Sequence, residues 1–320
     1  MKTMQHLLFG AGLIILLGSL TACGGFRYLE AEPLEFHQLD YGFESKFVEI
    51  NDLRISYIDE GRGDKTIILI HGLASNAGFW RYNIPELSAK NRVIAIDLPG
   101  YGKSSKGDFP YGIAWYAEVI RDVIQELNLN NVVYVGHSMG GQIGMTLALN
   151  HPDAISQLVL AAPAGIEAFS PGSGNWLRNV FTIRGIKTVP ESGIRENLSL
   201  NFHRWNSRWE WMVEERTRLA KAQEMDEFAY TVIQCVGAML DEPTTHRLGD
   251  IQHETLLVYG RFDRLIPNMY LNPGSPDAVF EFGHEQIPNS TLVRIDNAGH
   301  MVQIEQATDF NQAILNWLSR

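Results

Sequence analysis

The sequence predicts an α/β protein, with a mostly parallel eight-stranded sheet flanked by helices and a helical cap inserted into it. Short β-branched runs alternate with helical patterns in the parts of the chain before residue 166 and after residue 248. Between these positions the alternation stops and the pattern is helical throughout. Such alternation is typical of a parallel sheet covered on both faces, in which functional residues follow the carboxyl ends of the strands.

The first 22 residues have the pattern of a secretory signal peptide. Lys2 supplies a positive charge, and residues 7–20 form an apolar stretch that is short for a membrane span. Small residues close the stretch at Leu20-Thr21-Ala22-Cys23. These four residues resemble a bacterial lipobox, which predicts a lipoprotein signal peptide over 1–22. An uncleaved membrane anchor is the alternative interpretation.

The lipobox resemblance makes Cys23 the expected lipidation site and the new N-terminus. Gly24 follows it rather than Asp, which resembles sorting to the outer membrane of a bacterial cell envelope. We expect residues 23–44 to form the lipid-anchored tether, with the acylated Cys23 as the contact with the membrane. Cys235 is then the only other cysteine, so no disulfide is expected within the chain.

Eight segments have the apolar, β-branched character of strands, and two of the intervening segments have a clear helical period. The expected strands are 47–50, 54–58, 66–70, 93–96, 132–135, 158–161, 255–259 and 291–295, and the clearest helices are 114–127 and 308–318.

Ser138 lies at the centre of the sequence Gly136-His137-Ser138-Met139-Gly140. A strand pattern precedes this pentapeptide and a helical pattern follows it, as a sharp turn that exposes a nucleophilic serine requires. Glycines at 136, 140 and 141 would relieve the crowding of such a turn. We therefore expect Ser138 to be a catalytic nucleophile.

A serine hydroxyl needs a base, and the base needs a third group to orient it. Asp263 follows the strand expected at 255–259, and His300 follows the last expected strand. The chain order Ser138, Asp263, His300 is the order of a catalytic triad on an α/β sheet. No Asp or Glu follows the earlier strand over Ala161–Gly165, so Asp263 is the expected acid.

Two further segments carry a family resemblance. His71-Gly72-Leu73-Ala74 follows the strand at 66–70, and Asp97-Leu98-Pro99-Gly100-Tyr101-Gly102-Lys103-Ser104 follows the strand at 93–96. With the triad pattern, these segments resemble the α/β-hydrolase superfamily, in its serine esterase and lipase branch.

This resemblance covers residues 45–165 and 249–320, which are the expected two parts of an α/β-hydrolase core. It implies an oxyanion hole made by the backbone N–H groups of Leu73 and Met139. It also implies that His71, Gly72 and His137 lie at the substrate, with His71 shaping the oxyanion loop and His137 packed beside the nucleophile. Residues 166–248 match no motif and are expected to form the helical cap.

The cap segment holds four of the seven tryptophans, which are Trp176, Trp205, Trp209 and Trp211. Large aromatic side chains are usually packed, so we expect most of them to form the cap's own core.

The charge and the motifs exclude several classes of function. A formal net charge of −11 argues against nucleic-acid binding, which needs a basic footprint. Gly102-Lys103-Ser104 lacks the preceding glycine of a phosphate-binding loop, and His284-Glu285 lacks the second histidine of a zinc site. No cofactor or metal is therefore expected, and no pattern indicates an oligomeric state.

The sequence thus predicts a lipid-anchored hydrolase that cleaves a small-molecule or lipid carboxylic ester through an acyl-enzyme. One alternative is another reaction of the same triad, namely carbon–carbon bond hydrolysis, amide cleavage or acyl transfer. The other is a surface lipoprotein whose triad is idle and which serves as a binding scaffold.

Overall fold

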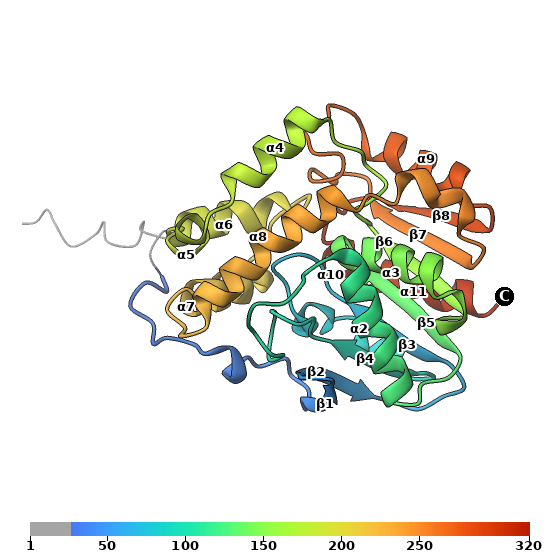
Figure 1. Cartoon of the computed structure of the whole chain (residues 1–320), viewed down its shortest axis with the longest axis horizontal. Coiled ribbons are helices and arrows are strands. Elements are labelled where there is room, and N and C mark those ends of the chain that lie inside the picture. Colours follow the sequence, from blue (N-terminus) through green and yellow to red (C-terminus); the bar gives the residue numbers. More distant parts are fainter. Residues whose placement is uncertain (1–26) are drawn as a thin grey trace, which may run out of the picture.

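The computed structural model describes residues 27–320, which form one sheet with helices on both faces and a helical layer at one end (Figure 1). The signal peptide expected over 1–22 and the lipidation site expected at Cys23 lie outside the described residues. Within residues 27–320, no helix has the length and apolar character needed to cross a membrane.

The sheet has eight strands, and each expected strand is found to within two residues. The strands are β1 (Lys46–Ile50), β2 (Leu53–Glu60), β3 (Thr66–Ile70), β4 (Arg92–Ile96), β5 (Val132–His137), β6 (Gln157–Ala161), β7 (Glu254–Gly260) and β8 (Ser290–Ile295). Their order across the sheet is β1-β2-β4-β3-β5-β6-β7-β8. β2 pairs antiparallel with β1 and β4, and every other pair is parallel, which confirms the predicted fold class.

The β3 side chains show why a parallel sheet was predictable here. All five residues of β3 are buried, and the strand lies between β4 and β5. A strand covered on both faces has no polar side, so it appears in the sequence as a continuous apolar run. The parallel strands end together at one edge of the sheet, where the loops that follow β3, β5, β7 and β8 meet.

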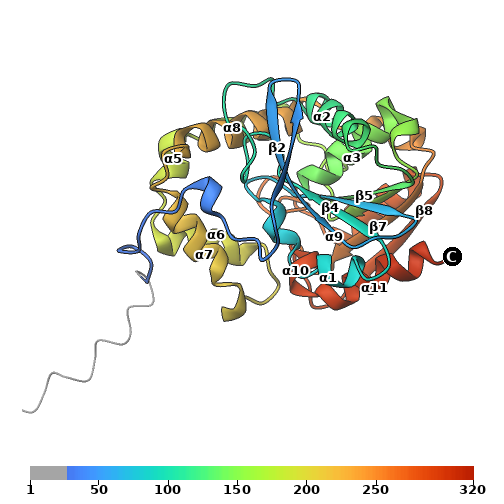
Figure 2. The same cartoon turned by 90° about the horizontal axis from the view of Figure 1, so that it is seen from below.

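Helices cover both faces of the sheet, with α2 and α3 on one face and α1, α10 and α11 on the other (Figure 2). The helices of the core are α1 (Ile84–Leu87), α2 (Ile113–Glu126), α3 (Met139–Asn150), α9 (Pro276–Gln286), α10 (Val302–Glu305) and α11 (Ala307–Leu318).

Five helices lie between β6 and β7 and form the layer at the end of the sheet (Figure 1). They are α4 (Pro171–Val180), α5 (Ile183–Lys187), α6 (Glu191–Leu200), α7 (Trp211–Leu219) and α8 (Met225–Asp241). Trp209 is buried and stacks on Phe202, and Trp205 and Trp211 pack around this pair, as expected of a cap core. Trp176 is the exception, because its side chain is 54% exposed.

The described part of the expected tether, residues 27–44, is not a free linker. Phe36, Leu39 and Tyr41 are almost fully buried in the main hydrophobic core. Earlier in the same segment, the backbone N–H groups of Arg27 and Tyr28 donate hydrogen bonds to the carboxylate of Glu191, at 3.0 and 2.7 Å. The large apolar side chains explain this docking, since burying each one stabilises the contact of the segment with the domain.

Asp97, at the end of β4, ties this segment to the core. Its buried carboxylate accepts hydrogen bonds from the Tyr41 hydroxyl at 2.8 Å, the Ala77 amide at 2.8 Å and the Lys103 amide at 2.9 Å. A buried carboxylate is tolerated when donors satisfy it in this way. The same bonds hold the loops that follow β3 and β4.

Candidate active site

Ser138 lies on a sharp turn between β5 and α3, with φ 53° and ψ −118°. This conformation is rare for a residue with a side chain, and strain of this kind concentrates at functional sites. The flanking glycines are required by close contacts. A Cβ atom at Gly136 would lie 2.3 Å from the carbonyl oxygen of Gly140, and one at Gly140 would lie 2.4 Å from that of Ile70.

Asp263 and His300 meet although 37 residues separate them in the chain. The loops after β7 and β8 carry them, and His300 Nδ1 lies 2.8 Å from Asp263 Oδ2. Asp263 Oδ1 accepts hydrogen bonds from the amides of Leu265 and Ile266, at 2.8 and 3.0 Å. The carboxylate is therefore fixed from both sides. With Nδ1 as the donor to Asp263, the other ring nitrogen of His300 is left to accept a proton.

His137 packs against His300, with 4.7 Å between the ring centroids. Its Nε2 lies 3.0 Å from the backbone oxygen of His300 and must carry a proton to donate to it. Burial, and then the neighbouring His300, hold the pKa of His137 well below its usual range. His137 is therefore a neutral side chain that orients the backbone of His300.

The loop after β3 approaches Ser138 closely. A Cβ atom at Gly72 would lie 3.0 Å from the Ser138 Cβ, so only glycine allows this distance without a shift. Leu73 follows in the same loop and lines the cavity next to Ser138. Met139 is the first residue of α3, so its amide has no acceptor within the helix. Both amides therefore belong to the segments that border Ser138.

His71 requires a correction, because it lies behind this loop and not along the cavity that Gly72 and His137 line. Its Nε2 accepts a hydrogen bond from the Leu98 amide at 3.1 Å, so Nδ1 carries the proton and donates to the Gly72 carbonyl at 2.8 Å. Burial lowers the pKa of His71, which favours this neutral form. His71 holds the loop in place from beneath.

Ser138 and His300 both line a cavity of about 650 Å³ beneath the cap. Most of its wall is apolar. The apolar side chains that the cap contributes include Phe169, Leu177, Phe181, Leu198, Val236 and Leu240.

Three charged side chains of the cap segment also line this cavity, and no sequence motif indicated them. They are Glu167, Glu215 and Arg216. Burial raises the pKa of Glu215 to about 7, although its carboxylate accepts a hydrogen bond from Asn76 at 2.8 Å. Burial also raises the pKa of Glu167 and lowers that of Arg216 to about 10. Near neutral pH, Arg216 is thus charged while Glu215 is half ionised.

Glu305, on α10, is a second feature that the motifs did not indicate. Its buried carboxylate accepts a hydrogen bond from the Gly299 amide at 2.7 Å, in the loop that carries His300. It also accepts bonds from the amides of His203 and Arg204 in the cap, at 2.8 and 2.9 Å. One carboxylate therefore joins the cap to the backbone next to His300.

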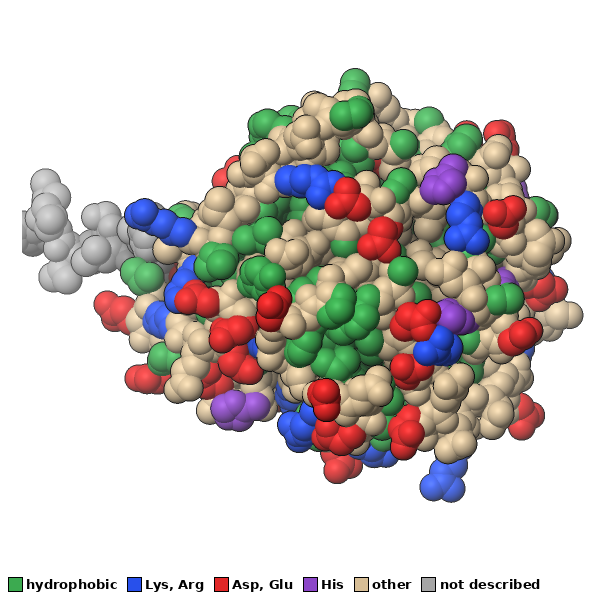
Figure 3. Space-filling model, viewed as in Figure 1, with side chains coloured by type: hydrophobic (Ala, Val, Ile, Leu, Met, Phe, Trp, Pro, Cys, Tyr) green, Lys and Arg blue, Asp and Glu red, His purple; other side chains and the backbone are tan. Residues whose placement is uncertain are grey.

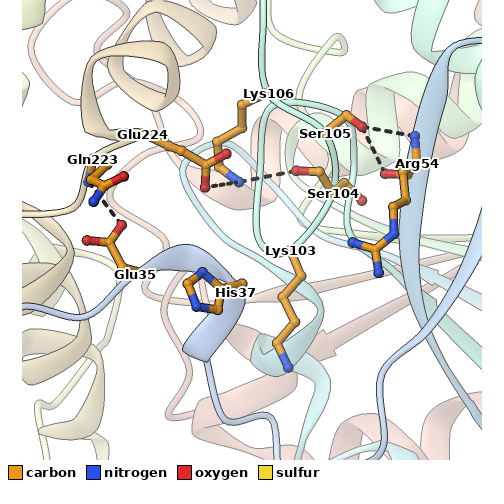
Figure 4. A pocket seen from close by; sticks show the side chains of 9 residues that line it. All are labelled: Glu35, His37, Arg54, Lys103, Ser104, Ser105, Lys106, Gln223 and Glu224. Carbon is orange, nitrogen blue, oxygen red and sulfur yellow. Dashed lines mark hydrogen bonds and ion pairs between the residues drawn. The ribbon is translucent and has the colours of Figure 1, made fainter.

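A second cavity, of about 490 Å³, is lined by polar and charged residues and does not include Ser138 (Figure 4). Its side chains largely satisfy one another, since Lys106 pairs with Glu224 at 3.7 Å and the Ser105 hydroxyl bonds to the Arg54 backbone. The cavity is lined by Glu35, His37, Arg54, Lys103, Ser104, Ser105, Lys106, Gln223 and Glu224.

No group of three or more His, Cys, Asp or Glu side chains within residues 27–320 is arranged to hold a metal ion. Cys235 is buried and forms no disulfide among these residues, and burial raises the pKa of its thiol to about 11. Its thiol is therefore a packed group and not a nucleophile.

The chain belongs to the α/β-hydrolase family, because residues 65–307 match the family model described as the alpha/beta hydrolase fold. It is 30% identical over 298 residues to a 2-hydroxy-6-oxononadienedioate/2-hydroxy-6-oxononatrienedioate hydrolase of Pseudomonas putida, covering 86% of this chain and 96% of that protein. The protein is therefore a hydrolase of this fold.

Two solved structures show the same fold. One is described as a "probable hydrolytic enzyme" of Pseudomonas aeruginosa, with a TM-score of 0.81 and 24% identity, covering 89% of this chain and 98% of that one. The other is an esterase of Exiguobacterium antarcticum, with a TM-score of 0.73 and 24% identity, covering 87% of this chain and all of that one.

The hydrogen bonds of Glu305 predict that Glu305→Gln impairs the site although residue 305 lies outside the triad. The amide nitrogen of glutamine would face a backbone N–H group, which should lower the free energy of unfolding by about 2 kcal/mol. Misplacement of His300 should slow phosphonylation of Ser138 by a fluorophosphonate probe roughly tenfold or more. Glu285→Gln, at an exposed position on α9, is the matched control. Equal labelling rates in the two variants would refute the positioning role.

Proposed function

We propose that the protein is a serine hydrolase that cleaves carboxylic esters with a neutral, apolar acyl group. The observation that carries this proposal is the cavity beside Ser138. Its wall is mostly apolar, and its charged groups are two carboxylates, Glu167 and Glu215, against one cation, Arg216. Such a wall favours an uncharged acyl chain over a dicarboxylate, because burying an unpaired charge is costly.

In the proposed mechanism, Ser138 Oγ attacks the ester carbonyl while His300 accepts its proton. Asp263 holds His300 with Nδ1 as the donor and stabilises the imidazolium that forms. The tetrahedral intermediate then expels the alcohol, which takes the proton from His300, and the acyl group remains on Ser138. A water molecule, deprotonated by His300, attacks the acyl-enzyme and releases the acid.

We assign the oxyanion hole of this mechanism to the backbone amides of Leu73 and Met139. Negative charge develops on the carbonyl oxygen during both attacks, and preorganised N–H donors stabilise it by about 3 to 4 kcal/mol each. The Met139 amide has the further advantage of the N-terminal end of α3, where the helix dipole favours negative charge. Gly72 permits the Leu73 amide to come close to Ser138.

Carbon–carbon bond hydrolysis by the same triad is the second candidate. The similarity to the Pseudomonas putida hydrolase favours it, since that protein is named for dienedioate and trienedioate substrates. Arg216 could pair with one carboxylate of such a substrate. The two carboxylates in the cavity wall oppose a second negative charge, which is why we favour the ester.

We also propose that Cys23 is acylated and that the protein is held on a membrane of the bacterial cell envelope, namely the outer membrane. The sequence Leu20-Thr21-Ala22-Cys23 after a short apolar stretch supports this proposal. With a net charge of −11, the chain as a whole has no electrostatic attraction to anionic lipid, so acyl chains would have to supply the membrane affinity.

The triad predicts that Ser138→Ala and His300→Ala each reduce kcat/KM for p-nitrophenyl esters by about 10⁴-fold or more, because the three groups act as a unit. The double variant should be scarcely worse than either single one. Asp263→Asn should cost about 10⁴-fold, since asparagine favours the wrong tautomer of His300. Circular dichroism controls for folding.

A folded Ser138→Ala protein with near wild-type activity would refute the mechanism. Inactivity of the wild type on every ester would favour carbon–carbon hydrolysis or a binding scaffold.

The pKa of Glu215 predicts a pH-dependent preference between two substrates of similar size, p-nitrophenyl butyrate and the p-nitrophenyl monoester of succinic acid. Because the pKa is raised to about 7, the carboxyl group is mainly neutral at pH 6 and mainly charged at pH 8. Like-charge repulsion of about 1 kcal/mol should lower kcat/KM of the succinate ester, relative to the butyrate, about fivefold between these pH values. In Glu215→Gln the ratio should stay constant. A pH-dependent ratio that persists in this variant would contradict the assignment.

The lipobox predicts that Cys23→Ala leaves ester hydrolysis intact but removes the anchor. The wild type should incorporate radiolabelled palmitate. It should also fractionate with the outer membrane, because two acyl chains give stable membrane binding where one does not. The variant should incorporate no palmitate. Palmitate incorporation into Cys23→Ala would show that lipidation occurs elsewhere.

A further inference from the structure

An exposed apolar surface lies on the outer side of the cap, at α4 and α5. Trp176 is 54% exposed, Val180 45% and Ile183 39%. Figure 3 shows several hydrophobic side chains exposed along the edge where Figure 1 places α4. Several large apolar side chains left exposed on neighbouring elements of a folded domain indicate a contact surface. We call Trp176, Val180 and Ile183 the cap face.

The sequence around the cap face has no negative charge. Residues 168–190 contain Arg178, Arg184 and Lys187 but no Asp or Glu, in a chain with a net charge of −11. Arg178 and Lys187 pair with exposed carboxylates of α8, while no ion pair of Arg184 is found among residues 27–320. Apolar and aromatic side chains interspersed with basic ones are typical of segments that lie at a lipid surface.

The described chain begins beside the cap face. Glu191 accepts its hydrogen bonds from Arg27 and Tyr28 at the first residue of α6, four residues after α5 ends. In Figures 1 and 2 the described chain begins at the cap end of the molecule, opposite the C-terminus. Leu29, in the same segment, is 53% exposed and adds to the apolar surface at this end.

Chain length then limits how far the cap can lie from the membrane. Only four residue steps separate Cys23 from Arg27, and a fully extended chain spans about 3.5 Å per residue, so the reach is about 14 Å. With Cys23 in the bilayer, the N-terminal end of α6 must stay within that distance of the lipid. A long free tether would have allowed any orientation, but the docking of residues 27–44 on the domain removes that freedom.

From this geometry we propose that the cap face docks on the lipid bilayer to which Cys23 is anchored, so that acyl substrates pass from the bilayer into the cavity through the cap. The inference rests on the proposed ester hydrolysis and on the proposed lipidation. Val180 is exposed on the cap face and also lines the cavity. Leu177, Phe181 and Ile186 line the cavity beside it.

The test uses full-length protein purified from membranes and placed in phosphatidylethanolamine vesicles containing phosphatidylglycerol. The variant carries Trp176→Ser with Ile183→Ser, two positions that do not line the cavity. The matched control carries Phe47→Ser with Phe282→Ser, at 38% and 39% exposed positions of β1 and α9. Each protein is assayed on a fluorogenic long-chain ester embedded in the vesicles and on soluble p-nitrophenyl butyrate.

We expect the Trp176→Ser, Ile183→Ser variant to hydrolyse the embedded ester roughly tenfold more slowly, because two apolar membrane contacts are lost. Its rate on the soluble ester, and both rates of the control variant, should match the wild type. An unchanged rate on the embedded ester would overturn the proposal.

A second measurement is independent of activity. In vesicles of dibrominated phosphatidylcholine, the emission that Trp176 contributes, taken as the difference between the wild type and Trp176→Phe, should be quenched. Absence of quenching would overturn the docking surface even if the enzyme cleaves esters. If the wild type cleaves no ester but Trp176 is quenched, the proposed function fails while the docking surface is supported.

Discussion

The crowding of backbone around Ser138 is the constraint on which the site depends. The carbonyl oxygen of Ile70 leaves no room for a Cβ atom at position 140, and that of Gly140 leaves none at position 136. β3, β5 and α3 can therefore approach this closely only because glycine stands at both positions. This approach brings the loop with Leu73 beside Ser138, at the edge where the strands end. The position of Ser138 and the proposed oxyanion hole thus follow from how closely two neighbouring parallel strands and one helix can pack.

The sheet and the meeting of Asp263 with His300 were predictable because their signals are local. A strand buried on both faces is a continuous apolar run, and a residue placed just after such a run lies at the carboxyl edge of a parallel sheet. Asp263 and His300 could therefore be assigned to one edge without knowing the path of the chain between them. Their 2.8 Å contact is what this reasoning requires.

The remaining features of the site depend on contacts between distant segments, which no local pattern records. Glu215 meets Asn76 across 139 residues, and Glu305 meets His203 across 102. Neither carboxylate follows a strand or belongs to a motif. The absence of His71 from the cavity wall and the docking of residues 27–44 on the domain could not be predicted for the same reason. Partners supplied by the fold, namely the Leu98 amide for His71 and the core for Phe36 and Tyr41, decide where these residues lie.

The three hydrogen bonds of Glu305 tie the cap to the loop that carries His300. Two of its three acceptor contacts go to the amides of His203 and Arg204 in the cap, and the third goes to Gly299, next to the proposed base. A swing of the cap that carries residues 203 and 204 away from the core must break two of these bonds and release the support of the His300 loop. The enzyme would then be open and catalytically idle, or closed and competent, so that substrate exchange and proton transfer alternate.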